Sequence, residues 1–553
     1  MIRSTFLTVT GVAALWLAMP LAVAAEDAPL VEAPAGTMRG EMLDGVAAFR
    51  GIRYAQAPTG RLRWRPPVAA DALAGVNDAT RFGPACHQPP SRPDSIYAPA
   101  ETPAMSEDCL SLNVWTPAAA GHAPEKAPVF VWIHGGALSG GAGSEGMYDG
   151  ARLAAQGMVA VTINYRLGVL GYLAHPQLSE ESDDGVSGNY GLLDQIEALR
   201  WVQRNIAAFG GDPGNVTIAG ESAGALSVMY LMAAPPARGL FHKAIAQSAY
   251  MISTPALRDA VHGTPSAEAS GLALSQTIEV RGVPRLRAMD AQALTVQAAL
   301  SGFFPLGNVD GGVLPAQPIS AFDAGKQAAV PILAGFNEGE IRSLRFLLPP
   351  PPADAAAYEA GIRSRYGDLA EAMLQRYPGT DLDASMLATT RDAMYGWTSE
   401  RLVRSQTALG QPSYLYYFDH GYPDADAKGL HAFHAAEIPY ALGTADRASP
   451  NWPAIPDTDT EKRLSDAMLA YWTSFARDGV PAAAGQPEWR PYGDARAYMA
   501  FDGEPEPGEH LMPGMFELVE EVVCRRRAQG DVPWHWNVGI VAPPLPDGAT
   551  GCP

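Results

Sequence analysis

The sequence predicts an α/β protein in which helices cover both faces of a mostly parallel sheet. Short apolar runs rich in β-branched residues recur along the chain, as in buried strands. Segments with apolar residues at helical spacing lie between them. The chain shows no repeat of 20–50 residues, which sets aside solenoids and propellers. Apolar strands that alternate with amphipathic helices are typical of a parallel sheet covered on both sides.

The predicted elements follow one another along the chain. Strands are expected at residues 128–133, 158–163, 215–219, 243–246, 330–334 and 413–418. Helices are expected over 192–206 and about 461–476, where apolar residues recur at helical spacing, and residues 225–230 are helix-like. The Ala-rich segments 253–328 and 345–410 are helix-like and less regular. We expect them to be insertions over the carboxyl ends of the strands, where pockets form in such sheets.

Composition and charge limit the function. The chain has 553 residues, 47% of them hydrophobic, and 39 Lys and Arg against 59 Asp and Glu, a formal charge of −20. This composition excludes a disordered chain. The acidic balance argues against a nucleic-acid partner, which would require a basic surface. The predicted organisation is a single domain over residues 25–553, large for one unit but common among α/β enzymes with insertions.

The N-terminus has the pattern of a secretory signal peptide. Arg3 precedes an apolar stretch over residues 6–23, and small residues around Ala24 form an A-x-A cleavage signal. We expect residues 1–24 to be removed and the protein to be exported, to the periplasm or the medium. An uncleaved membrane anchor is the alternative, disfavoured because Pro20 interrupts the stretch. No later stretch reaches transmembrane length, so no integral membrane segment is expected after cleavage.

Export permits disulfides, and the cysteine count is even. Cys86, Cys109, Cys524 and Cys552 allow three pairings. We favour the two local ones, Cys86 with Cys109, and Cys524 with Cys552, which would pin a Pro-rich C-terminal tail. A metal site is the competing interpretation, but the chain has no C-x-x-C and no His at ligand spacing beside these residues. No metal is therefore expected.

Two motifs carry chemistry. The segment G-E-S-A-G at 220–224 follows a predicted strand and precedes a predicted helix, the setting of a nucleophile elbow that presents Ser222. A structural turn serine is the alternative. Residues 134–137, H-G-G-A, follow strand 128–133, and their backbone N–H groups, with that of Ala223, are suited to bind an oxyanion. An ordinary glycine turn is the alternative there.

Further segments at 49–55, 106–114, 164–166 and 209–213 accompany these motifs in order. Together, from about residue 30 to about 503, they resemble the type-B carboxylesterase family, which includes the cholinesterases. The resemblance implies an α/β-hydrolase fold, no cofactor, and a Ser-Glu-His triad in that chain order. It implies an oxyanion hole of Gly135, Gly136, Ala137 and Ala223.

The triad partners follow from the same resemblance. The acid falls in the segment 335–340, where Glu340 matches by spacing from the glycine and Glu338 is the runner-up. The H-x-x-E motif of residues 434–437 selects His434 and leaves His431 as a surface or pocket-rim residue. Physically, a carboxylate orients the imidazole and stabilises the imidazolium.

The resemblance also assigns supporting residues. Ser248 matches a buried serine that the family bonds to the triad, and Glu221 matches the carboxylate beside the nucleophile, where it can tune the pKa of His434. Arg63 with Glu107, and Arg166 with Asp194, match ion pairs that stabilise the fold.

The expected reaction is hydrolysis of a small-molecule carboxylic ester through an acyl-enzyme on Ser222. Choline esters are disfavoured because residues 87–108 hold no Trp to stack on a quaternary ammonium, Tyr97 being the one aromatic there. A lipase, a natural-product esterase and, remotely, a non-catalytic cholinesterase-like scaffold remain the alternatives. Five aromatic residues expected near the pocket are assigned to the core first: Tyr395, Trp397, Tyr440, Trp452 and Trp472. The sequence leaves the oligomeric state open.

Overall fold

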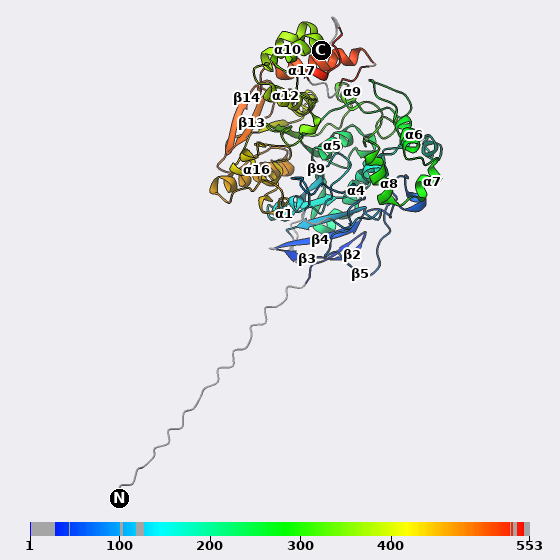
Figure 1. Cartoon of the computed structure of the whole chain (residues 1–553). Helices are drawn as coiled ribbons and strands as arrows, with labels where there is room; N and C mark the ends of the chain where they lie inside the picture. The colour runs from blue at the N-terminus through cyan, green and yellow to red at the C-terminus, as the bar shows by residue number, and fades with distance from the viewer. Residues whose placement is uncertain are drawn as a thin grey trace.

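The computed structural model describes Met1 and residues 28–43, 45–99, 103–117, 126–530, 532–534 and 539–546. Within these residues the fold is built on an eleven-stranded sheet of order β14-β13-β12-β11-β10-β9-β7-β8-β6-β4-β3 (Figure 1). Its strands are β3 (Glu41–Leu43), β4 (Val46–Arg53), β6 (Ser111–Thr116), β7 (Ala127–Ile133), β8 (Val159–Ile163), β9 (Gly211–Glu221), β10 (Lys243–Gln247), β11 (Ile332–Asn337), β12 (Ser413–Phe418), β13 (Ala497–Asp502) and β14 (Glu504–Glu509).

The middle of the sheet is parallel, as the sequence predicts. Strands β8, β7, β9, β10, β11, β12 and β13 pair in parallel, and all six predicted strands are present. The two ends of the sheet are antiparallel, through β3, β4 and β6 at one end and β14 at the other. Strands β3 and β14 escape the sequence pattern because β3 has three residues and β14 carries two prolines and is mostly exposed. Strands β4 and β6 are largely buried, and the predicted strands do not include them.

Both faces of the sheet are covered, which explains the continuous apolar runs. Along β7, Phe130 and Trp132 pack into one buried cluster with α16 (Asp459–Asp478), and Val131 and Ile133 pack into the other with α4 (Tyr190–Asn205) and α5 (Ala223–Ala233). Successive side chains of a strand point to opposite faces, so both sets need an apolar environment. The other helices that cover the sheet or connect its strands are α1 (Ala151–Ala155), α2 (Gly168–Tyr172), α3 (Pro176–Glu180), α14 (Pro423–Ala427) and α15 (Ile438–Ala441).

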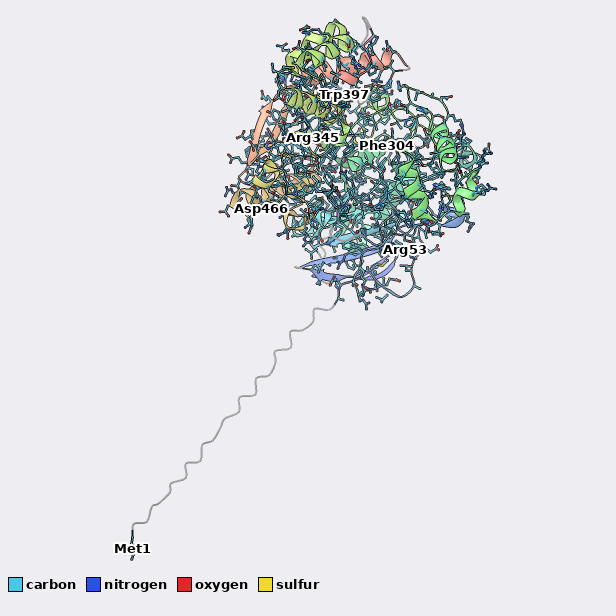
Figure 2. All side chains as sticks on the ribbon, viewed as in Figure 1. Met1, Arg53, Phe304, Arg345, Trp397 and Asp466 are labelled. Atoms are coloured by element: carbon cyan, nitrogen blue, oxygen red, sulfur yellow. A yellow bond between two sulfur atoms is a disulfide. The ribbon has the colours of Figure 1, made fainter. Side chains whose placement is uncertain are left out.

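The two Ala-rich insertions are helical. The first contains α6 (Ala267–Thr277), α7 (Val283–Ala288), α8 (Ala291–Leu300) and α9 (Pro318–Asp323), and the second contains α10 (Ala355–Tyr366), α11 (Ala370–Arg376), α12 (Leu382–Arg391), a π-helical turn η7 (Asp392–Gly396) and α13 (Trp397–Ala408). Figure 2 marks Phe304 in the first and Arg345 and Trp397 in the second, all in the upper part of the view above Arg53 of β4. A small second sheet joins β1 (Leu30–Ala33), β2 (Gly36–Arg39) and β5 (Val76–Asp78).

Several predicted cross-links are confirmed. Cys86 and Cys109 form a disulfide, and Arg63 pairs with Glu107 at 2.6 Å. The Arg166 guanidinium donates to the buried Asp194 carboxylate at 2.7 Å through two nitrogens. These pairs tie separate segments of the chain together.

The C-terminal segment follows α17 (Met515–Ala528), which carries Cys524. Cys524 is disulfide-bonded, but its predicted partner Cys552 lies outside the described residues, as does the predicted signal peptide apart from Met1. Among the helices that the structure describes, none is long and apolar enough to cross a membrane.

Candidate active site

Ser222 lies on a sharp turn between β9 and α5. Its backbone has φ 54° and ψ −119°, a strained conformation for a residue with a Cβ atom. A Cβ on Gly224 would lie 2.0 Å from the Ile133 carbonyl oxygen, so only glycine allows α5 to approach β7 this closely. The Ser222 N–H donates to the Gln247 carbonyl at 2.9 Å, which fixes the turn against β10. The side chain of Ser222 therefore stands at a fixed, partly accessible position.

His434 and Glu340 meet at the ends of the next strands. His434 follows β12, Glu340 follows β11, and their loops are joined by a parallel bridge between Gly339 and Phe433. The His434 Nδ1 atom bonds the Glu340 carboxylate, whose second oxygen accepts from the Asn337 N–H at 2.9 Å. Glu340 is fully buried. The predicted pair is thus brought together on the same edge of the sheet as Ser222.

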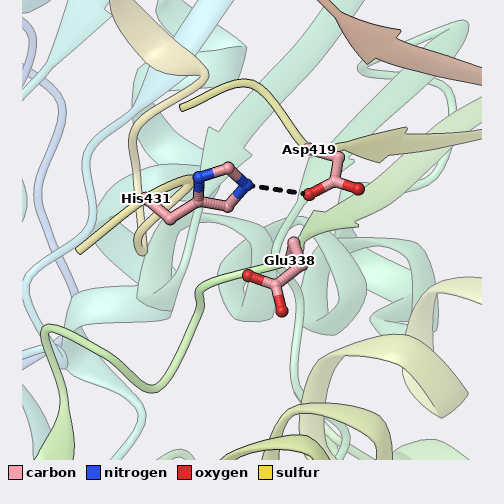
Figure 3. Close-up of side chains that lie close together, drawn as sticks. All are labelled: Glu338, Asp419 and His431. Atoms are coloured by element: carbon pink, nitrogen blue, oxygen red, sulfur yellow. Dashed lines mark hydrogen bonds and ion pairs between the residues drawn. The ribbon is translucent and has the colours of Figure 1, made fainter. Parts of the chain in front are cut away.

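Glu338, the runner-up for the acid, points the other way. Its carboxylate faces Arg342 at 3.2 Å and lies in a surface cluster with Asp419 and His431 (Figure 3). One ligand atom of each of these three residues lies within 4.8 Å of the others, and among the described residues this is the one such group that could hold a metal ion. Because Arg342 balances Glu338 and His431 lies between Asp419 and Asp426, the charges already pair without an ion.

A second carboxylate faces the imidazole. The His434 Nε2 atom lies 3.0 Å from Glu221 Oε1. Within the described residues, His434 makes no hydrogen bond to the Ser222 hydroxyl. Burial lowers the pKa of His434, but the negative charges of Glu221 and Glu340 outweigh it and raise the pKa overall. Burial raises the pKa of Glu221. Of the two groups, His434 binds the proton between Nε2 and Glu221 more strongly than the Glu221 carboxylate does, because Glu340 stabilises the imidazolium at its other nitrogen.

Two of the predicted oxyanion-hole residues adjoin Ser222: Gly135 lies close to it in space, and Ala223 follows it in the chain. A Cβ on Gly135 would lie 3.4 Å from the Ser222 Cβ. Gly136 and Ala137 both have positive φ, 98° and 54°, so this turn is held in an unusual conformation. Ala223 supplies the first N–H of α5, one of the N–H groups that lack a partner within the helix. The structure records no acceptor for the N–H groups of Gly136 and Ala137 within its described part.

A third buried carboxylate, Glu437, completes the network, and sequence reasoning assigned it no role. It accepts from the Gln247 side-chain amide at 2.9 Å and from the Asn337 side-chain amide, and Gln247 in turn accepts from Trp472 Nε1 at 3.0 Å. Burial, reinforced by Glu340, raises the pKa of Glu437. The H-x-x-E motif of residues 434–437 contained the signal for it, because its glutamate is Glu437.

The remaining predicted residues have mixed places. Ser248 is buried beside the site with φ 51°, but among the described residues no hydrogen bond joins it to Ser222, Glu340 or His434. Tyr395, from η7 of the second insertion, lies against the His434 imidazole with ring centroids 5.2 Å apart. Trp397, Tyr440 and Trp452 are buried, as their assignment to the core predicts.

Comparison with known proteins gives a consistent answer. Residues 27–513 match the model of the carboxylesterase family. The chain is 36% identical to the fumonisin B1 esterase of Sphingopyxis macrogoltabida over 89% of this chain and 90% of that protein. It is 35% identical to the para-nitrobenzyl esterase of Bacillus subtilis, with 81% and 89% covered, and 33% identical to human carboxylesterase 3, with 95% and 96% covered.

Solved structures agree with this. A PNB esterase structure superimposes with a TM-score of 0.76 at 32% identity, covering 89% of this chain and 99% of that one. A carboxylesterase of Geobacillus stearothermophilus gives 0.73 at 33% identity, with 90% and 99% covered. The predicted α/β-hydrolase fold is confirmed, with its large mixed sheet flanked by helices. The chain therefore belongs to the carboxylesterase family and is a carboxylic ester hydrolase.

Proposed function

We propose that the protein is an exported serine carboxylesterase that works through an acyl-enzyme on Ser222. The observation that carries this proposal is the strained Ser222 turn beside a buried, carboxylate-bonded His434. In the first step His434 takes the hydroxyl proton while Ser222 Oγ attacks the ester carbonyl. The alcohol then leaves with a proton from the imidazolium, and a water activated by His434 cleaves the acyl-enzyme to release the acid.

The other residues support this reaction from fixed positions. The N–H groups of Gly135, Gly136, Ala137 and Ala223 are proposed to bind the oxyanion of each tetrahedral intermediate. The closeness of Gly135 to Ser222 and the position of Ala223 directly after it support this role. Glu340 orients the imidazole, and Glu221 and Ser248 support it. The reaction needs no cofactor, because the nucleophile, base and oxyanion donors all come from the chain.

The substrate is proposed to be a small or medium carboxylic ester. Relatives of similar identity have names as different as fumonisin B1 esterase, para-nitrobenzyl esterase, cocaine esterase and acylcarnitine hydrolase. Membership of the family thus supports the reaction class and leaves the alcohol and acyl groups to experiment. Esters with long acyl chains, which would make the protein a lipase, are the second outcome to be tested.

The experiment is hydrolysis of p-nitrophenyl esters from acetate to palmitate by the mature protein, with Ser222→Ala in parallel. We expect a maximum at short chains and loss of turnover in the variant. A maximum at long chains would identify a lipase. Turnover that survives in Ser222→Ala, together with failure of a fluorophosphonate to label the wild-type protein, would contradict the serine mechanism.

Export is proposed from the sequence of the first 24 residues and is supported by the Cys86–Cys109 disulfide. Cell fractionation with N-terminal sequencing of the mature chain tests it. A start at Ala25 in the periplasm or the medium is expected, whereas an intact Met1 in the membrane fraction would indicate an anchor.

A further inference from the structure

Tyr97 contacts the backbone of the proposed catalytic base from a distant part of the chain. It belongs to the segment closed by the Cys86–Cys109 disulfide, 337 residues before His434. Its phenol oxygen lies 2.9 Å from the His434 carbonyl oxygen and 2.8 Å from the Ser343 hydroxyl. Ser343 lies three residues after Glu340, so the phenol touches both loops that supply triad residues.

The chemistry of these groups fixes the direction of the bonds. A carbonyl oxygen can only accept, and a phenol has one proton. The Tyr97 hydroxyl therefore donates its hydrogen bond to the His434 carbonyl, and the Ser343 hydroxyl donates to the phenol oxygen. Burial raises the pKa of Tyr97 well above its usual range, so the phenol keeps its proton throughout the pH range of ester hydrolysis.

The segment that carries Tyr97 is itself held in place. The Asn451 side-chain amide donates to the Pro93 and Ser95 carbonyls, at 2.7 Å and 3.0 Å. The Tyr97 ring packs edge-on against Trp452, with centroids 5.9 Å apart. Because these contacts hold the Tyr97 side chain in place, its hydroxyl can hold the His434 carbonyl in place in turn. A mobile side chain could not do this.

The acceptor is in a loop that needs external support. Ala435, the residue after His434, has φ 71°, so the backbone turns through a strained conformation there. The Phe433 carbonyl, just before His434, accepts from the Asn337 side-chain amide at 2.9 Å. Two consecutive carbonyls are thus anchored, one by β11 and the other by Tyr97.

We propose that Tyr97 is a positioning residue that holds the His434 backbone so that the imidazole stays in reach of both Ser222 and Glu340. The proposal rests on the proposed function of Ser222 and His434. Tyr97 acts through His434, so its loss should slow the proton transfer and leave substrate binding intact.

The test compares Tyr97→Phe with Tyr358→Phe in the full mature chain. Tyr358 is a matched control, because its buried phenol also donates to a backbone carbonyl, that of Tyr377 at 3.0 Å, in α10 away from the triad. We expect Tyr97→Phe to lower kcat for p-nitrophenyl butyrate by roughly 5–10-fold, the equivalent of one hydrogen bond, with KM changed less than about 2-fold. Fluorophosphonate labelling of Ser222 should slow by the same factor, whereas Tyr358→Phe keeps the wild-type kcat.

Other outcomes overturn the proposal. If both Phe variants lower Tm alike and keep the wild-type kcat and labelling rate, Tyr97 is a structural residue. Ser343→Ala keeps the hydrogen bond from the Tyr97 phenol to the His434 carbonyl, so kcat should stay within about 2-fold of the wild type. A loss of kcat equal to that of Tyr97→Phe would assign the effect to Ser343. Failure of the proposed function is distinguishable, because Ser222→Ala would then retain turnover.

Discussion

The Nε2 atom of His434 lies 3.0 Å from Oε1 of Glu221, the carboxylate next to the proposed nucleophile. The imidazole is therefore held between two buried carboxylates, because its Nδ1 atom bonds Glu340. A cation between two negative charges is stabilised, so the imidazolium form persists to higher pH than in a free histidine. In the proposed mechanism His434 must lose this proton before it can accept the proton of Ser222.

Glu221→Gln is expected to shift the acid side of the pH–rate profile to lower pH. Only neutral His434 can act as the base, so wild-type kcat/KM should rise with pH as the imidazolium deprotonates. Glutamine removes one of the negative charges that raise the pKa of His434, and the midpoint should fall by about one pH unit or more. The measurement is kcat/KM for a p-nitrophenyl ester from pH 5 to 10.

Glu338→Gln is the control for this shift, since it removes a nearby carboxylate that does not face His434. Its profile should match the wild type. If Glu221→Gln leaves the midpoint unchanged, Glu221 is uncharged while His434 titrates.

Glu340→Gln should lower kcat by roughly 10³–10⁴-fold, because an amide neither stabilises the imidazolium nor fixes the tautomer that presents Nε2 to Ser222. The same substitution at Glu338 should leave kcat within about 2-fold, since that side chain pairs with Arg342 at the surface. Steady-state kinetics of the two purified variants decide between the two glutamates. Equal losses in both would exclude Glu340 as the specific partner of His434.

The sequence was sufficient to predict the parallel middle of the sheet, because the strands from β7 to β12 are buried on both faces and each therefore appears in the sequence as a continuous apolar run. It was insufficient for the antiparallel ends, where strands such as β14 derive their pairing from a neighbour and not from their own residues. The Ser222 turn and the His434–Glu340 pair follow strands, so local motifs mark them.

Contacts between distant segments could not be predicted in this way. Tyr97 reaches the His434 carbonyl from a disulfide-closed segment whose described residues form no helix or strand, and no periodicity of residues 87–108 indicates that partner. The same holds for Tyr395, whose ring contacts His434 from the π-helical turn Asp392–Gly396. Such contacts depend on loop geometry, which sequence patterns describe poorly.

Gly135→Ala should lower kcat by roughly 10²-fold or more. The added Cβ would lie 2.9 Å from the Glu221 backbone oxygen and from its carboxylate, closer than such atoms approach, so the turn of residues 135–137 must shift. A shift of this turn moves the proposed oxyanion donors away from the reacting carbonyl. Gly312→Ala is the control, because a Cβ there meets nothing closer than 3.9 Å. Wild-type kcat in Gly135→Ala would show that this turn does not take part.

His431→Gln is expected to destabilise the fold in a pH-dependent way. The ring lies 3.1 Å from Asp419 and 2.8 Å from Asp426, with Glu338, Arg342 and Arg391 at the edge of the same cluster. Its hydrogen bond to Asp419 raises the pKa of His431 to about 9, against partial burial and with a further contribution from Asp426.

Because the folded-state pKa is the higher one, the folded protein binds this proton more tightly than the unfolded chain. The stabilisation is therefore complete below the ordinary histidine pKa of 6.5 and disappears as the pH rises through about 9. With a third of the side chain exposed, solvent screening limits it to about 1 kcal/mol. Urea unfolding should show His431→Gln less stable than the wild type at pH 6 and equal to it at pH 10. An equal deficit at both pH values would mean that His431 acts by packing and not through its charge.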